Sequence, residues 1–208
     1  MCQAQLVTIE QSATPLSRAD TRRAAIHEAA IVEFSTHGIK GASMARIADG
    51  ACVSRPALYQ YFANKDEIFA SAFLALFEGH VERAVAELRQ EGAVADQLDG
   101  FLQRFVGDLW ERMAASAHAD EIESAKTGDL ALATAELLNG LWQELDGYLA
   151  MLSPGAGAAA VARRQGWRDL VQLASRGLRA DQPTIDTYRQ RLRALAQSIA
   201  ADIDASRK

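Results

Sequence analysis

A short stretch of this 208-residue chain gathers side chains that could read a nucleic acid. Arg55 follows Ser54, a residue type that caps helix N-termini, and its planar guanidinium can donate to both major-groove acceptors of guanine. Tyr59 and Tyr61 carry hydroxyls that suit phosphate oxygens, and Gln60 suits either a base edge or the phosphate backbone. We therefore expect a helix that begins at Ser54, with Arg55 as its main base-reading residue.

Two short helices joined by a tight turn would position these side chains. Apolar residues at intervals of three and four predict a first helix with one buried side: Met44, Ile47, Ala48 and Ala51. Pro56 falls in the first turn of the second helix, where its missing N–H does no harm. This pattern predicts a helix-turn-helix, whose second helix can enter the major groove. Ser43, Ser54 and Lys65 then lie at helix starts, where free N–H groups favour a phosphate.

Each of these residues also has an ordinary structural explanation. A single arginine on a helix is usually only solvated, and tyrosines beside a phenylalanine usually pack. The joint occurrence of the caps, the proline, the tyrosines and the basic helix start favours DNA binding. Charge agrees, because the chain carries a net charge of -5, yet Lys40, Arg46, Arg55 and Lys65 stand against Asp49 alone between residues 40 and 65. A cationic contact surface on an acidic body indicates local binding rather than indiscriminate coating of nucleic acid.

The composition and periodicity of the chain predict an all-α protein. There are only 4 prolines, so long stretches are free of the strongest helix breaker. We expect a flexible leader over 1–17, a helix-turn-helix domain over 18–66 and a larger helical domain over 67–208, with the fourth helix shared between the two domains. No run approaches the roughly 18 apolar residues of a membrane span, and no basic residue opens a secretory signal. We therefore expect a cytoplasmic protein without membrane contact.

The residues for several other chemistries are not found in the sequence. It contains no GxSxG, Walker loop, HExxH or dinucleotide glycine pattern to anchor an enzyme. Two cysteines, Cys2 and Cys52, cannot build a disulfide framework or a multi-cysteine metal site. His118 beside Asp120 and Glu121 is explained more simply by capping and solvation than by a metal. We expect no catalysis, no metal and no cofactor.

The stretch from Thr21 to Phe73 resembles the N-terminal DNA-binding domain of the tetracycline-repressor (TetR) family. Its most specific part is VSRPALYQYFANKDEI, residues 53–68, and the resemblance covers about a quarter of the chain. Ala45 stands where some relatives carry a basic or polar side chain, and Ala57 where a hydroxyl is frequent, so specificity should depend on Arg55 and Gln60. The residues and the resemblance together predict this DNA-binding set: Ser43, Arg46, Ser54, Arg55, Pro56, Ala57, Tyr59, Gln60, Tyr61 and Lys65.

The resemblance further implies a homodimer that binds a pseudo-palindromic operator in double-stranded DNA and is released by a small-molecule inducer, as a repressor rather than an activator. Apolar stripes in the last two helices predict a four-helix dimer face, the alternative being that they pack within their own monomer. The expected dimer residues are Val161, Leu170, Ala174, Leu178, Tyr188, Leu192, Leu195 and Ile199.

The larger domain also holds aromatic and aliphatic residues that could line an inducer pocket, although such residues are more often ordinary core. These candidates are Phe101, Phe105, Trp110, Met113, Leu138, Trp142 and Tyr148. Nothing in the sequence identifies the inducer or the operator. The alternative function is a helical protein-interaction adaptor or an unrecognised enzyme, neither of which needs to bind DNA.

Overall fold

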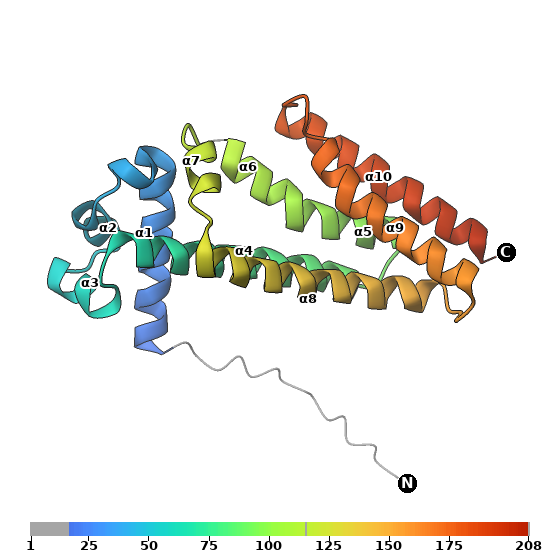
Figure 1. Ribbon diagram of the computed structural model, residues 1–208, viewed down its shortest axis with the longest axis horizontal. Coiled ribbons are helices and arrows are strands. Elements are labelled where there is room, and N and C mark those ends of the chain that lie inside the picture. The colour runs from blue at the N-terminus through green and yellow to red at the C-terminus, as the bar shows by residue number, and fades with distance from the viewer. Residues whose placement is uncertain (1–16, 115, 208) are drawn as a thin grey trace, which may run out of the picture.

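The computed structural model describes residues 17–114 and 116–207, and every element that it contains there is a helix, which confirms the predicted all-α class. Three helices form a head at one end of the molecule: α1 (Arg18–Gly41), α2 (Met44–Gly50) and α3 (Arg55–Tyr61). The long α4 (Lys65–Leu88) leaves the head and runs into the body, as Figure 1 shows. The leader expected over 1–17 lies outside the described residues except for Ser17.

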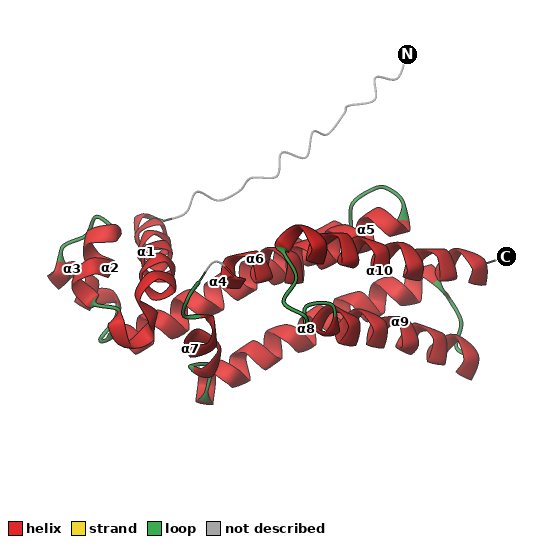
Figure 2. Ribbon diagram, turned by 90° about the horizontal axis from the view of Figure 1, so that it is seen from above, coloured by secondary structure: helices red, strands yellow, loops and turns green. Residues whose placement is uncertain are grey.

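The remaining helices form the elongated body. In chain order they are α5 (Val94–Leu102), the π-helical segment η1 (Gln103–Gly107), α6 (Asp108–Ala114), α7 (Ala119–Ser124), α8 (Gly128–Leu152), α9 (Ala158–Gly177) and α10 (Ile185–Ser206). Helix α4 packs against α5 and α8, while α10 lies along α5 (Figure 2). The short α7 contacts α1, so the body reaches back to the head at a second place besides α4.

Local sequence signals determine where the helices of the head begin. Ser17 forms a capping box with Asp20, each side chain accepting a backbone N–H from the other end of the box. The side chains of Ser43, Ser54 and Asn64 accept backbone N–H groups at the starts of α2, α3 and α4. The helix starts predicted at Ser43, Ser54 and Lys65 are confirmed.

Two hydrophobic cores meet on α4. The head core joins apolar residues of α1, α2 and α3 to the first turns of α4, and the body core takes over further along the same helix. Phe73 packs against both cores. A boundary between residues 66 and 67 stays a prediction, because the cores themselves share α4 rather than divide at its start.

The residues of α10 that were expected at a dimer face lie elsewhere in the structure. Tyr188, Leu192 and Ile199 are buried in the body core of their own monomer, so the prediction that they form a dimer face is wrong. The Tyr188 hydroxyl donates to the Ser175 carbonyl oxygen at 2.8 Å, and burial raises the pKa of Tyr188 to about 12. Leu195 packs against the same core. The stripe was read correctly as apolar, but α5 of the same chain covers it.

Helix α9 behaves differently from α10. Its inner side buries Trp167 and Val171, whereas Val161, Leu170 and Leu173 remain exposed, Leu173 at 66%. Leu178, just beyond the helix, packs against the body core, and Ala174 is half-buried. Only part of the expected face therefore stays available for a partner. Across the described part of the chain, no helix is both long and apolar enough to cross a membrane.

Gly38 carries a break in α1 that only glycine adopts readily. Its φ is 70°, and a Cβ built on it lies 2.2 Å from a carboxylate oxygen of Glu121. We expect Gly38→Ala to lower the free energy of unfolding by about 1–2 kcal/mol, because a left-handed alanine is strained and the added methyl displaces Glu121. Urea unfolding of the full chain measures this. Gly41→Ala is the matched control, since its Cβ meets only His37 at an ordinary 3.5 Å; equal losses in both variants would contradict the explanation.

Candidate nucleic-acid interface

The outer side of α3 presents the side chains predicted to read bases. Arg55 and Tyr59, one turn apart, are both exposed, and the guanidinium carbon of Arg55 lies 6.0 Å from the centre of the Tyr59 ring. Among the described residues no carboxylate lies within ion-pair distance of Arg55. Gln60 and Pro56 are exposed beside them. Stacking on Tyr59 leaves the guanidinium N–H groups available to a ligand.

The inner side of α3 attaches the helix to the head. Leu58 is fully buried, and Tyr61 packs against the head core, where it is half-buried. Tyr59 and Tyr61 are two positions apart on a helix and so do not share a face. Both tyrosines were predicted to contact DNA, but Tyr61 anchors α3 on the head core whereas Tyr59 faces solvent. Ala57 is half-buried between the two sides.

The two serines at the helix starts keep a free donor. The hydroxyl of Ser43 accepts the Arg46 N–H at 3.3 Å, and that of Ser54 accepts the Ala57 N–H at 3.3 Å. A serine hydroxyl that accepts a capping hydrogen bond retains its own proton to donate. Both serines can therefore cap their helices and bind a phosphate oxygen at the same time.

Arg46 is engaged inside the head. Its Nε donates to Oε1 of Glu33 at 2.7 Å, and its Nη2 donates to the Gly41 carbonyl oxygen. Glu33 is buried and also accepts the Ser43 N–H at 2.9 Å. Burial alone raises the pKa of Glu33, but the hydrogen bonds from Arg46 and Ser43 outweigh it and hold the pKa below its ordinary value. The ion pair fixes α2 against α1, so Arg46 acts first as a positioning residue.

Lys65 was predicted to contact a phosphate, but its ammonium group is bonded within the head. Its ammonium group donates to the carbonyl oxygens of Ile39 at 2.8 Å, Lys40 at 3.1 Å and Ala42 at 3.5 Å. An ammonium has three donors, and all three are used within the head. The break at Gly38 leaves carbonyls at the end of α1 without helical partners, and Lys65 satisfies them. A phosphate at the start of α4 would therefore meet its backbone N–H groups rather than this side chain.

A contact between α7 and α1 was missed by the sequence reasoning. The break at Gly38 exposes the Lys40 N–H, which donates to Oε1 of Glu121 at 3.0 Å, and His118 Nδ1 lies 3.5 Å from the other oxygen of Glu121. The Ser116 hydroxyl donates to the Ser35 carbonyl oxygen at 2.9 Å. Glu121 thus connects the body to the head, while His118 lies beside Glu121 and its side chain makes no capping hydrogen bond. No local pattern signals a pair 81 residues apart.

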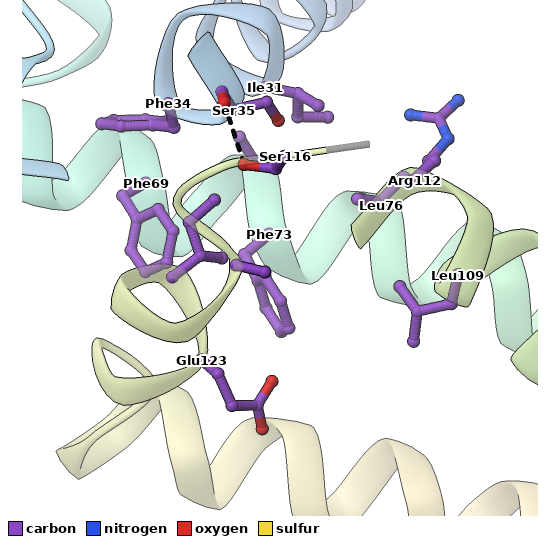
Figure 3. Close-up of a pocket in the computed structure, with 13 residues that line it drawn as sticks. Ile31, Phe34, Ser35, Phe69, Phe73, Leu76, Leu109, Arg112, Ser116 and Glu123 are labelled. Atoms are coloured by element: carbon purple, nitrogen blue, oxygen red, sulfur yellow. Dashed lines mark hydrogen bonds between the residues drawn. The ribbon is translucent and has the colours of Figure 1, made fainter. Parts of the chain in front are cut away.

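A cavity lies between α1, α4, α6 and α7, where head and body meet (Figure 3). Its volume is about 70 Å³. Its walls are mostly apolar, and its lining residues are Ile31, Phe34, Ser35, Phe69, Ala72, Phe73, Leu76, Leu109, Arg112, Ser116, Ala119, Ile122 and Glu123. The predicted pocket residues are absent from this lining.

Those predicted pocket residues mostly belong to the body core. Phe101, Phe105, Trp142 and Tyr148 are buried there, and the rings of Phe105 and Trp142 meet edge to face at 5.7 Å. Trp110 and Leu138 pack against the same core. The side chain of Met113 lies outside the described residues. Most of these aromatic side chains therefore pack on one another in the body, although Tyr148 also lines a surface hollow with Gln97 and Met151. An inducer pocket among these residues stays a prediction.

Comparisons with known proteins agree with this geometry. The sequence model described as "Bacterial regulatory proteins, tetR family" matches residues 26–72, from α1 into α4. The chain is 34% identical over 88 residues to the HTH-type transcriptional repressor SCO4008 of Streptomyces coelicolor, a match that covers 42% of each protein. It is 41% identical over 71 residues to the HTH-type transcriptional activator FasR of Mycolicibacterium smegmatis, covering 34% of this chain and 31% of FasR.

The whole fold has solved counterparts. The TetR-family regulator SCO4454 of Streptomyces coelicolor superposes with a TM-score of 0.57 at 18% identity, over 88% of this chain and 96% of that one. The head of this chain, over residues 26–72, therefore matches the tetR family in sequence. The sequence matches span about two fifths of SCO4008 and a third of FasR, and the body of this chain is similar to SCO4454 in fold alone.

The Glu33–Arg46 pair gives the head a testable dependence on pH. The pKa of Glu33 lies below its ordinary value of 4.5 in the folded chain. The carboxylate therefore stabilises the head above about pH 4.5, and this contribution is lost as the pH falls through the lowered pKa. Glu33→Gln lacks it at every pH, so the difference in free energy of unfolding from wild type should shrink between about pH 6 and about pH 3.5.

Urea unfolding at several pH values measures that difference. Glu28→Gln on the exposed side of α1 is the matched control and should differ little from wild type throughout. A Glu33→Gln deficit that stays constant over the whole pH range would show that the charge of Glu33 is not what stabilises the head.

Proposed function

We propose that this protein is a transcriptional regulator that binds an operator in double-stranded DNA as a homodimer and leaves it when a small-molecule inducer binds. The observation that carries the proposal is the state of Arg55. It is the exposed first residue of α3, it stacks on Tyr59, and the described part of the chain offers it no acidic partner. An arginine held in this way on the outer side of a helix-turn-helix is suited to guanine.

The surroundings of α3 supply the weaker contacts that orient it on DNA. The hydroxyls of Ser43 and Ser54 and the N–H groups at the start of α4 are suited to phosphate oxygens. Gln60 and Tyr59 can add a base or backbone contact. Because Arg46 and Lys65 are tied to the head itself, sequence preference depends on few side chains and chiefly on Arg55.

Two heads must lie about 34–36 Å apart to enter successive major grooves, and a dimer supplies that spacing. In place of the buried α10 stripe, we assign the dimer face to exposed apolar side chains on α8 and α9. These are Leu132, Met151, Val161, Leu170 and Leu173, with exposed fractions between 44% and 66%. A second copy that covers them would remove large apolar side chains from water, which favours association.

Replacing Arg55 by alanine tests base recognition. The operator is first selected from random DNA fragments by the purified wild-type protein. Arg55→Ala should lose roughly 1–3 kcal/mol of binding free energy on that operator and little on random DNA, because a bidentate guanine contact is lost while the phosphate contacts remain. Fluorescence anisotropy at fixed salt measures both. Arg163→Ala, which removes an exposed arginine from α9, should change neither; equal losses on both DNAs from Arg55→Ala would remove its assigned role.

The dimer assignment predicts a different outcome for two helices of the body. Leu170→Asp with Leu173→Asp on α9 should yield folded monomers with little operator affinity, since two charges cannot be buried unpaired at the interface. Leu192→Asp on α10 should instead unfold the chain, because Leu192 is fully buried in the monomer. Sedimentation velocity and circular dichroism separate these results. Val32→Asp, at a comparably exposed position of α1, is the control; a dimeric α9 variant would contradict the assignment.

A further inference from the structure

The cavity at the junction of head and body has an apolar lining that suits the apolar part of a small ligand. Three phenylalanines, Phe34, Phe69 and Phe73, contribute to its apolar walls, together with Leu109 and Ile122. Ser116 and Ser35 close one edge through the hydrogen bond drawn in Figure 3. Apart from the two serines, polar groups are confined to the rim, so the interior suits an aromatic ring or a branched alkyl group.

The rim of the cavity is cationic. Arg112 and Glu123 stand at its two edges with their charged ends directed away from the apolar walls (Figure 3). Glu123 forms an ion pair with Lys126, whose ammonium also lies 5.0 Å from the centre of the Phe73 ring. Within the described residues Arg112 has no carboxylate at ion-pair distance. The uncompensated charge at the rim is therefore the guanidinium, which pairs well with a carboxylate.

The size of the cavity decides what must move on binding. At about 70 Å³ it is smaller than the roughly 150 Å³ that accommodates benzene in an engineered protein cavity. An aromatic ligand therefore has to displace a wall. Helix α7 is the wall that we expect to move, because it is short, has no buried residue and packs on the head core only through half-buried Ile122, whereas the α1 and α4 walls contain buried Phe34 and Phe69.

Displacing α7 acts directly on the head. Helix α7 is joined to α1 by the hydrogen bond from the Lys40 N–H to Glu121 and, just before the helix, by the one from Ser116 to the Ser35 carbonyl. A ligand that enters between α7 and α4 pulls on both contacts. The head then loses its attachment through α7 and keeps those through α4 and through Leu130 of α8, which is buried in the head core.

We propose that this junction cavity binds a small aromatic or branched aliphatic carboxylic acid, with the apolar part between α1, α4 and α7 and the carboxylate on Arg112. The consequence for DNA rests on the proposed function, but the binding itself does not. The site is distinct from the aromatic body core in which the inducer pocket was expected, and it places the ligand in contact with the DNA-binding head.

The binding test uses 4-fluorophenylacetate as an anionic probe and 4-fluorophenylacetamide as its neutral isostere, observed by fluorine NMR on the full-length protein without DNA. The acid should bind at least about tenfold more tightly than the amide, as expected for one charge-assisted contact. Arg112→Gln should remove that difference by weakening only the acid. No binding of the acid, or equal affinities of both probes in wild type, overturns the proposal.

A cavity-filling variant locates the probe. Ala119→Leu places a larger side chain in the lining and should weaken both probes about tenfold or more, whereas Ala117→Leu, an equal change at an exposed position outside the lining, should leave them unchanged. Circular dichroism establishes that both variants are folded. If Ala119→Leu disrupts α7, the Arg112→Gln result still decides the site. Unaltered binding by folded Ala119→Leu places the probe elsewhere and overturns the proposal.

The link to the head is read from the Lys40 amide. Saturation with 4-fluorophenylacetate should move its proton NMR signal upfield, because the hydrogen bond to Glu121 is lost. An unmoved signal with the probe demonstrably bound overturns the coupling step. Failure of the proposed function is distinguishable, since a protein without operator affinity can still bind the probe, and a protein that binds operator can fail to bind it.

Discussion

Helix α4 has to satisfy two hydrophobic cores at once, and its phenylalanines make this possible. In the head, Phe69 meets Phe34 of α1 edge to face at 5.3 Å. One turn further Phe73 packs against both cores, and Phe77 reaches Phe105 of the body at 6.3 Å. Because close-packed rings resist partial displacement, the orientation of the head is coupled to packing inside the body. A loop between the domains would carry no such coupling.

Two positive side chains of the head, Arg46 and Lys65, bind backbone carbonyl oxygens that need donors. The break at Gly38 releases carbonyl oxygens at the end of α1, and buried or crowded carbonyls require donors. Lys65 supplies three of these donors and Arg46 another, while Glu33 balances the charge of Arg46. Within the described residues Arg55 has no ion-pair partner and contacts the Tyr59 ring. The positive residues that stabilise the head are therefore different from the one proposed to read bases.

The second junction between head and body, at α7, buries far less apolar surface than α4 does. Helix α7 has no fully buried residue and attaches to the head through Glu121, the neighbouring Ser116 and half-buried Ile122. Polar contacts that are half open to water contribute little each, whereas the phenylalanines of α4 each bury a large apolar area. A strongly buried attachment and a weaker one therefore act on the same head, and the cavity lies between them.

The sequence by itself determined the all-α class, the helix starts of the head and the exposed place of Arg55 on α3, because caps, proline and apolar spacing act within a few residues. It also indicated the tetR-family head, whose motif lies in one short stretch. Only the tertiary structure decided that α10 packs on α5, that Lys65 binds carbonyls near residue 40 and that Glu121 reaches α1. Periodicity shows that a stripe will be covered but not by what, and hydrogen bonds between residues far apart in the chain leave no local pattern to read.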